Sequence, residues 1–251
     1  MACYIGTSGW HYDHWRGVFY PEGLPKARWL EFYARHFTTV EINNSFYRLP
    51  SEAAFAGWRD SSPADFTFAL KVNRFITHIK RLKNTGEAIA KFLDRAKILG
   101  KKLGPLLYQL PPNMHRNDEV LASFLAALPL GLQHVFEFRH LSCLDERVFS
   151  LLRQHNAGFC VFDMPDIVCP LMATADFAYI RFHGSSGLYS SRYSDEELAG
   201  WAERISSLVR DLKAVHLYFN NDAEAFAVSN ARTLREYLLG GGKVASGSEM
   251  I

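Results

Sequence analysis

Charged and amide side chains follow short apolar runs at many points along this chain. Carboxylate, lysine and histidine groups transfer protons near neutral pH when their neighbours tune them. Guanidinium groups bind carboxylate or phosphate through two hydrogen bonds. Together these residue types suit acid–base chemistry on a small anionic molecule. The residues concerned are Glu41, Asn43, Lys71, Gln109, Glu137, Arg139, Asp163, Arg181, His183 and Asn220.

The apolar runs have the length of β-strands, and helical patterns separate most of them. Ile89, Phe92, Leu93, Ala96 and Leu99, for example, recur at the spacing of one helix face. The predicted strands cover residues 3–6, 39–43, 66–72, 105–110, 134–138, 158–163, 177–182 and 215–219. The predicted helices cover about 25–36, 51–61, 87–99, 118–128, 145–154, 195–212 and 224–238.

Eight such alternations with short connections predict the α/β class and a single TIM-type (β/α)8 barrel over residues 1–239. Residues 240–251 are expected to form a flexible C-terminal tail. The sixth unit is predicted to be degenerate, because the segment from Pro165 to Ala175 is short and offers at most a broken helix. An open doubly wound sheet is the alternative fold. In a barrel, the carboxyl ends of all the strands meet at one rim, where active sites form.

The bulk composition limits the classes of protein. A chain of 251 residues, 48% of them hydrophobic, can bury a large core. A net charge of +2, from 28 basic and 26 acidic residues, does not indicate non-specific nucleic-acid binding. No stretch approaches the roughly 20 apolar residues that span a bilayer, and the N-terminus has no basic leader, so we expect a cytoplasmic protein without a membrane partner. The four widely spaced cysteines are expected to be reduced.

Alternation along each strand predicts which side chains face the barrel axis. The apolar parity should face the helices, which leaves the polar parity inside. Strand four is less regular, and Gln109 is placed inward because it shares its parity with Leu107. The other residues predicted to face inward are Thr39, Glu41, Asn43, Thr67, Ala69, Lys71, Glu137, Arg139, Asp163, Tyr179, Arg181, His183, His216, Tyr218 and Asn220.

Ionised groups inside a barrel lose hydration unless they are paired. We therefore expect one network in which three acids neutralise three bases. The acids are Glu41, Glu137 and Asp163, and the bases are Lys71, Arg139 and Arg181. One interpretation is that this network only stabilises the barrel. The other is that it forms a site, which its predicted place at the strand ends favours.

A series of short motifs runs in order from about residue 4 to about residue 235. They are Gly6-Thr7-Ser8-Gly9-Trp10, Trp15-Arg16-Gly17, Phe19-Tyr20-Pro21, Val40-Glu41-Ile42-Asn43, Ser45-Phe46-Tyr47-Arg48, Lys71 with Thr77-His78, Lys102-Leu103-Gly104-Pro105, Gln109-Leu110-Pro111-Pro112, Glu137-Phe138-Arg139-His140, Arg181-Phe182-His183-Gly184, Phe219-Asn220-Asn221-Asp222 and Asn230-Ala231. In these motifs the chain resembles the YecE-like proteins, domain-of-unknown-function family 72. The resemblance implies a TIM-type barrel and implies no established reaction or cofactor. His11 and His14 lie outside this pattern.

The predicted function is an enzyme, a hydrolase, lyase or isomerase, that binds a small phosphate- or carboxylate-bearing substrate at the rim. Glu41 or Glu137 would act as the general base and His183 or His78 as the acid. Lys71 would contribute to catalysis, with a structural ion pair or a Schiff base as its alternatives. Substrate binding is assigned to Ser8, Trp10, Asn43, Gln109, Arg139, Asp163, Arg181 and Asn220, and Tyr47 and His78 are secondary candidates.

Three other interpretations stay open. Glu41, Glu137, Asp163 and His183 could hold zinc or manganese, although the arginines disfavour a divalent metal. Aromatic residues in the first loops could stack on bases or sugars beside basic loop residues, which would indicate an endonuclease-like barrel acting on nucleic acid or nucleotides. A non-catalytic ligand-binding barrel is the third. Neither GxGxxG nor GxxxxGK[ST] occurs. The aromatic and basic residues are Trp10, Tyr12, Trp15, Phe46, Tyr47, Arg16, Arg48, Arg74, Lys80, Arg81 and Lys83.

Overall fold

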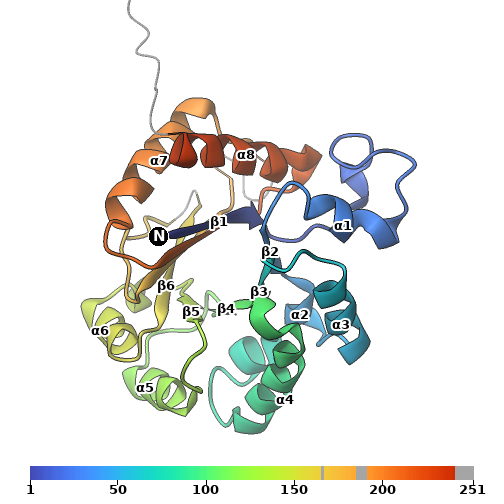
Figure 1. The fold of residues 1–251 in the computed structure, drawn as a ribbon. Coiled ribbons are helices and arrows are strands. Elements are labelled where there is room, and N and C mark those ends of the chain that lie inside the picture. The colour runs from blue at the N-terminus through green and yellow to red at the C-terminus, as the bar shows by residue number, and fades with distance from the viewer. Residues whose placement is uncertain (165–166, 185–190, 241–251) are drawn as a thin grey trace, which may run out of the picture.

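The computed structural model of this protein describes residues 1–164, 167–184 and 191–240. In these ranges eight strands form one parallel sheet in the order β1-β8-β7-β6-β5-β4-β3-β2. The strands are β1 (Ala2–Thr7), β2 (Thr39–Ile42), β3 (Thr67–Lys71), β4 (Leu103–Gln109), β5 (His134–Glu137), β6 (Gly158–Asp163), β7 (Phe177–Phe182) and β8 (Ala214–Phe219). The sheet curls into a nearly closed barrel with its helices outside (Figure 1), which confirms the predicted α/β barrel.

The helices follow the strands and cover the outside of the barrel (Figure 1). They are α1 (Trp29–Tyr33), α2 (Asn44–Tyr47), α3 (Glu52–Asp60), α4 (Gly86–Ala96), α5 (Asp118–Ala127), α6 (Glu146–Gln154), α7 (Asp195–Leu208) and α8 (Phe226–Leu239). Four of them begin at a side chain that accepts a backbone N–H of the first turn, as N-caps do. These caps are Ser51, Asn117, Asp145 and Ser194.

Two units differ from an ideal strand–helix pair. The predicted helix over 25–36 is a 3-10 turn, Lys26–Arg28, followed by the five-residue α1. Residues 167–176 form no helix, in agreement with the degenerate sixth unit that the short segment predicts. Positions 165 and 166 of that segment lie outside the described residues. Over the ranges that the structure describes, none of the helices is both long and apolar enough to cross a membrane.

The strands separate two hydrophobic regions, as alternation predicts. An outer region includes Val40, Ile42, Phe68, Leu70 and Phe136 and packs under the helices. An inner region lies along the barrel axis. Its members include Ala69, Leu107, Val135, Cys160, Tyr179 and Tyr218. The side chains predicted to face the axis from strands two, three, five, seven and eight agree with this division. Gln109 also faces the axis, because it lies two residues after Leu107 on the same side of β4.

The joint between β1 and β2 differs from the other seven. A single bridge, Ser8 to Glu41, joins the ends of these strands. Below it, the Tyr33 hydroxyl accepts the Thr7 N–H at 3.0 Å and donates to the Thr39 carbonyl at 3.0 Å. One phenol thus replaces ladder hydrogen bonds at this seam. A Cβ on Gly6 would lie 2.3 Å from the Thr39 carbonyl oxygen, so the close approach of the two strands requires glycine.

Candidate functional site

A buried ion network spans the carboxyl half of the barrel interior. Arg181, in β7, donates through Nη2 to Glu41 Oε1 at 2.8 Å and through Nη1 to Glu137 Oε2 at 2.7 Å. Arg139, directly after β5, binds the other oxygen of Glu137. The two carboxylates are fully buried and Arg181 is 1% exposed. Two acids from different strands are therefore joined by one guanidinium across the axis.

Neither carboxylate has an oxygen left without a partner. The Ser8 hydroxyl donates to Glu41 Oε1 at 2.6 Å, and the Tyr179 hydroxyl donates to Oε2 at 2.5 Å. On Glu137, the Cys160 thiol lies 3.7 Å from Oε2. Burial raises the pKa of this thiol well above its usual value, so it remains a donor. Ion pairs this deep lose much hydration, and the added hydrogen bonds offset that loss.

The arginines make Glu137 a poor proton acceptor. Burial alone would raise the pKa of Glu137, but Arg139 and Arg181 outweigh burial and hold that pKa far below its ordinary value. A general base works best when its pKa lies near the working pH. This carboxylate therefore has the chemistry of a fixed counter-ion rather than that of a base.

His183 is held as a neutral imidazole at the same end of the barrel. Burial, with the charge of Arg181, lowers the pKa of His183 well below its usual value. Its Nε2 lies 2.9 Å from Arg139 Nη2, which can only donate, so Nε2 accepts. The remaining proton then belongs on Nδ1, which lies 3.1 Å from the Asn220 amide. In the structure the amide nitrogen of Asn220 faces Nδ1, and because two donors would then oppose each other, the amide is assigned the flipped orientation with its oxygen toward Nδ1.

Lys71 is placed at the end of β3 by contacts of its own backbone. The Ser45 hydroxyl donates to the Lys71 carbonyl at 2.7 Å and to the Ile42 carbonyl at 3.1 Å, which ties α2 to the ends of β2 and β3. This brings the ring of Phe46 under the ammonium group, with Nζ 4.4 Å from the ring centroid. The side chain points inward, as alternation with Ala69 predicts.

The Lys71 ammonium is not part of the expected ion pairing. Across residues 1–164, 167–184 and 191–240, Nζ has no carboxylate within 4.0 Å and no hydrogen-bond acceptor. Within the described residues, the ion pairs of Glu41 and Glu137 all go to arginines. Burial and the nearby charge of Arg181 lower the pKa of Lys71 to about 8. The expected pairing of Lys71 with Glu41 or Glu137 is therefore wrong, because the arginines, together with the Tyr179 hydroxyl on Glu41 Oε2, occupy every carboxylate oxygen.

Asp163 does not join the network, contrary to the prediction. Its side chain hydrogen-bonds Tyr193 and Trp201, both of which pack in the outer hydrophobic region. Val161, two residues earlier, also lies in that region. The residues on both faces of this strand are apolar, so alternation alone did not indicate whether the Asp163 side chain faces the barrel axis or the helices.

The amide side chains predicted at the rim lie partly buried at the strand ends. The Asn43 amide nitrogen donates to the Ser8 carbonyl at 3.3 Å, whereas Asn43 Oδ1 is buried without a partner among the described residues. Gln109 ends β4 on the inner side, and Asn220 follows β8 beside His183. Hydrogen-bond acceptors and donors therefore lie at several strand ends around Lys71.

The predicted aromatic and secondary residues have different positions. Trp10 packs edge-on against Trp58 of α3 in the outer hydrophobic region, so it does not join the polar groups. Tyr47 is 72% exposed. His78 lies nearer to the polar groups, since its ring contacts the edge of Phe46 at 5.0 Å between centroids. Burial and the charge of Lys71 lower the pKa of His78.

The metal-ligand hypothesis is not matched by geometry. Within the part of the chain that the structure describes, no group of three or more His, Cys, Asp or Glu side chains could hold a metal ion. Glu41 and Glu137 bind guanidinium groups, and Asp163 lies on the other side of its strand. The four suggested ligands therefore do not converge on one point.

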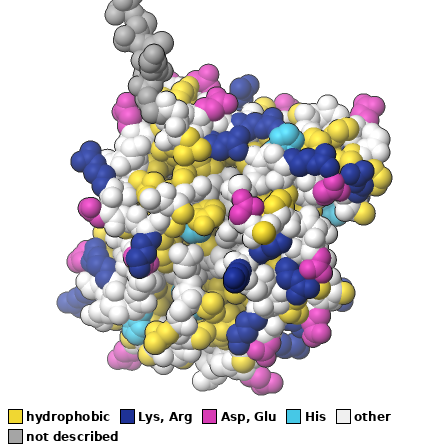
Figure 2. Space-filling model, viewed as in Figure 1, with side chains coloured by type: hydrophobic (Ala, Val, Ile, Leu, Met, Phe, Trp, Pro, Cys, Tyr) yellow, Lys and Arg dark blue, Asp and Glu magenta, His cyan; other side chains and the backbone are white. Residues whose placement is uncertain are grey.

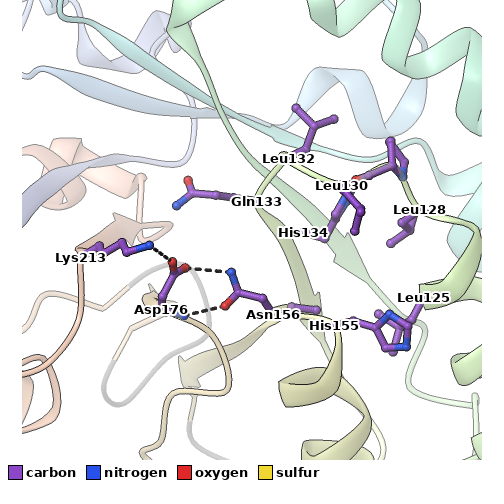
Figure 3. Close-up of a pocket in the computed structure, with 13 residues that line it drawn as sticks. Leu125, Leu128, Leu130, Leu132, Gln133, His134, His155, Asn156, Asp176 and Lys213 are labelled. Atoms are coloured by element: carbon purple, nitrogen blue, oxygen red, sulfur yellow. Dashed lines mark hydrogen bonds and ion pairs between the residues drawn. The ribbon is translucent and has the colours of Figure 1, made fainter.

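A cavity of about 360 Å³ lies at the opposite, amino end of the strands (Figure 3). Three of its polar side chains bind one another. Lys213 pairs with Asp176 at 2.7 Å, and Asn156 donates to Asp176 at 3.1 Å, as the dashed lines show. Because this end of a barrel normally contributes to stability, and because these groups are already satisfied, we assign this cavity a structural role.

Sequence reasoning did not identify two contributors to the site. The first is Cys160, which was predicted only to be reduced and whose thiol faces Glu137. The second is Met164, whose sulfur lies 2.7 Å from Arg139 Nη1. No signal in the sequence distinguished either residue, because both parities around Cys160 are apolar and Met164 follows the end of its strand.

Surface charge on one face is mixed. In the view of Figure 2, Lys and Arg side chains are interspersed with Asp and Glu, and apolar atoms lie among them. That face therefore has no continuous basic surface of the kind that binds nucleic-acid backbones.

Comparison with known proteins gives consistent results. Residues 4–248 match the family model described as "Protein of unknown function DUF72". The chain is 33% identical over 229 residues to the UPF0759 protein YecE of Escherichia coli (strain K12), covering 81% of this chain and 80% of YecE. It is 25% identical over 272 residues to the UPF0759 protein YunF of Bacillus subtilis (strain 168), covering 94% of each.

Solved structures are similar as well. A DUF72 family protein of Thermotoga maritima superposes with a TM-score of 0.87 at 30% identity, covering 95% of this chain and all of that one. A DUF72 family protein of Enterococcus faecalis has a TM-score of 0.83 at 20% identity, covering 94% and 95% of the two chains. The second likeness supports the fold alone.

Proposed function

Because this chain belongs to the DUF72 family, whose description names no reaction, we propose its function from the chemistry of the barrel mouth. We propose an enzyme that binds a small carboxylate- or phosphate-bearing molecule at the carboxyl ends of the strands. Lys71 is the charge partner of that molecule and the group that transfers a proton. Arg181, Glu41 and Glu137 position the site without touching the substrate.

The observation that carries this proposal is a charge surplus. Two carboxylates, Glu41 and Glu137, are matched by two guanidiniums, Arg139 and Arg181. His183 is neutral, since burial and Arg181 lower its pKa. Protonated Lys71 is then one positive charge beyond the matched pairs. A partly buried cation without a counter-ion raises the free energy of the folded protein, and a bound anionic ligand would offset that increase.

Polar groups around Lys71 support orientation of such a guest. Asn43 Oδ1 lacks a donor within the described residues and could accept a substrate hydroxyl. The amide groups of Gln109 and Asn220 lie at the carboxyl ends of β4 and β8, two strands that are not adjacent in the sheet. Placing a reacting group correctly is itself a large part of catalysis.

The proton-transfer role belongs to Lys71 rather than to the glutamates. With a pKa of about 8, Lys71 exists in both protonation states near neutral pH. Glu137 stays ionised, because Arg139 and Arg181 overcome the effect of burial and hold its pKa low. The earlier assignment of Glu41 and Glu137 as bases is therefore replaced in this proposal by a positioning role.

Thermal shift assays with phosphate, oxalate and pyruvate test the proposal. We expect at least one anion to raise Tm of the wild type in a concentration-dependent way, because a ligand that binds the folded state stabilises it. Lys71→Met should lose this response, and Lys71→Arg should keep part of it. The control is Lys101→Met, which changes an exposed lysine before β4, at the opposite end of the barrel.

Equal shifts in Lys71→Met and in the wild type would contradict the proposal, since they would mean that the anion acts elsewhere. General stabilisation by salts affects all variants alike, so the difference between the two methionine variants isolates the site.

A further inference from the structure

We propose that the Lys71 amine forms a covalent imine with the carbonyl carbon of an anionic aldehyde or ketone. This inference rests on the proposed function, since it adds a bond to the anion site described there. It names the substrate class as a carbonyl compound that also carries a carboxylate or phosphate group.

The first support is the freedom of the Lys71 nitrogen. Three other lysines of the described chain bind acceptors: Lys213 binds Asp176 at 2.7 Å, Lys26 binds Asp13 at 2.5 Å, and Lys102 binds the Ser62 carbonyl at 2.7 Å. Lys71 Nζ instead lies 4.4 Å above the centroid of the Phe46 ring, which cannot hold it through a hydrogen bond to oxygen. When Lys71 is unprotonated, the lone pair of Nζ can therefore point toward a bound substrate.

The second support is the placement of Lys71 in the fold. The residue ends β3 on the inner side of the barrel, and its side chain is only partly buried. The groups around it are two arginines and neutral histidines rather than free carboxylates. Lysines that react with carbonyl groups are activated by apolar surroundings and by neighbouring cations, and Phe46 and Arg181 supply both.

The third support is the protonation state. Burial and the charge of Arg181 lower the pKa of Lys71 to about 8. On the order of a tenth of the amine is then unprotonated at pH 7, far more than for an ordinary lysine with a pKa near 10.4. The amine is thus available as a nucleophile under mild conditions.

The reaction balances without a cofactor. Neutral Nζ attacks the carbonyl carbon, a C–N bond forms, and one proton passes from nitrogen to the carbonyl oxygen. The carbinolamine oxygen then takes a second proton from solvent and leaves as water. The product is a protonated imine, in which the positive charge remains on nitrogen. The anionic group of the substrate therefore keeps its charge partner after the bond forms.

Borohydride trapping tests the inference. The full-length protein is incubated with pyruvate, glyoxylate or dihydroxyacetone phosphate, reduced with sodium borohydride, and analysed by intact mass and peptide mapping. We expect an adduct with the mass of the probe less one oxygen atom, on the peptide that contains Lys71. Lys101→Met should be labelled like the wild type. Oxalate, which is anionic but has no ketone or aldehyde carbon, should protect Lys71.

Lys71→Arg separates this inference from the proposed function, because arginine keeps the charge but forms no such imine. We expect Lys71→Arg to lose the adduct and to keep a thermal response to oxalate. The pH at which half-maximal labelling occurs should lie near 8 for Lys71 and higher for surface lysines.

Two results would overturn the imine and leave the proposed function standing. The first is a probe that raises Tm of the wild type and gives no adduct at Lys71. The second is labelling spread over surface lysines to the same extent in Lys71→Arg. If no anion raises Tm of the wild type more than that of Lys71→Met, the proposed function fails and the imine fails with it.

Discussion

Lys71 and Arg181 both bring positive charge to the barrel mouth, but their surroundings give them different chemistry. Arg181 binds two carboxylates through a planar fork, and its pKa is raised well above the usual value, since the charges of Glu41 and Glu137 overcome the effect of burial. Lys71 has no carboxylate within reach in the described structure, and burial lowers its pKa to about 8. The sequence predicts that these residues meet. It does not predict which basic side chains pair with the two glutamates, because that pairing depends on the length and geometry of each side chain.

The first residue-scale prediction concerns Glu137. Glu137→Gln should lower the free energy of unfolding by about 3–5 kcal/mol, because it leaves Arg139 and Arg181 buried without this counter-ion. Urea denaturation measures the change. The exposed Glu87→Gln is the control and should stay within about 0.5 kcal/mol of the wild type. A loss below about 1 kcal/mol in Glu137→Gln would mean that the network does not hold the barrel together.

The second residue-scale prediction concerns His216, which stacks on Tyr4 at 4.7 Å between ring centroids and is buried with neither ring nitrogen bonded in the described structure. Burial lowers its pKa to about 3. The unfolded chain binds this proton near pH 6.5, so stability present above pH 6.5 is lost as the pH falls toward 3, by about 1.4 kcal/mol per pH unit.

His216→Phe removes this titration and two unsatisfied nitrogen atoms while keeping a flat ring. We expect the variant to be at least as stable as the wild type at pH 7 and to show a shallower decline between pH 6 and pH 4. The measurement is urea denaturation at several pH values. Parallel curves for the two proteins would refute the assigned titration.

At the scale of elements, the accuracy of the sequence predictions followed the strength of the local pattern. Alternation predicted the inner faces of β2, β3 and β5, where one parity is apolar and the other polar. It failed for Asp163 in β6, where both parities are apolar. The start of the helix predicted over 51–61 agrees with α3, where Ser51, a residue type that favours helix starts, accepts the Ala54 N–H. The role of Tyr33 at the β1–β2 seam had no local signal, because it depends on the hydroxyl reaching backbone groups of two strands, Thr7 in β1 and Thr39 in β2, at once.

The element-scale prediction concerns that seam. Tyr33→Phe should reduce the free energy of unfolding by about 1–3 kcal/mol, because it leaves the Thr7 N–H and the Thr39 carbonyl without their bridging hydroxyl. Tyr47→Phe, which removes an exposed hydroxyl, is the matched control and should be neutral. Hydrogen exchange should accelerate first at amides of β1 and β2. Unchanged exchange there would show that the phenol does not hold the seam.

At the scale of the whole molecule, one barrel accounts for every described strand, and the family match from residue 4 to residue 248 covers almost all of the chain. The barrel could be predicted because eight strand and helix patterns alternate with short connections. The chemistry of the mouth could not be predicted as fully, because pairing across the axis joins residues more than a hundred positions apart, such as Glu41 and Arg181.

The whole-molecule prediction concerns the domain boundary. We propose that residues 1–239 form one complete domain, because α8 ends at Leu239, which is exposed, whereas Leu234 is buried against the barrel. A chain that ends at Gly240 should unfold at the same urea concentration as the full chain. A shorter chain that ends at Asn230 should be destabilised strongly, since it lacks Ala231 and Leu234. A lower midpoint for the first truncation would show that later residues belong to the domain.

The linear order of the sheet also bears on how the chain can fold as it is synthesised. In the described structure β1 has a strand ladder only with β8, from Ala2–Ala214 to Thr7–Phe219, while its sequence neighbour β2 meets it through one bridge. Among the described strands of the barrel, β1 is synthesised first, and it waits for β8, which is synthesised last, before most of its backbone is paired. During translation, β1 stays without its ladder partner until about two hundred further residues have been made, so closure of the barrel follows the synthesis of β8.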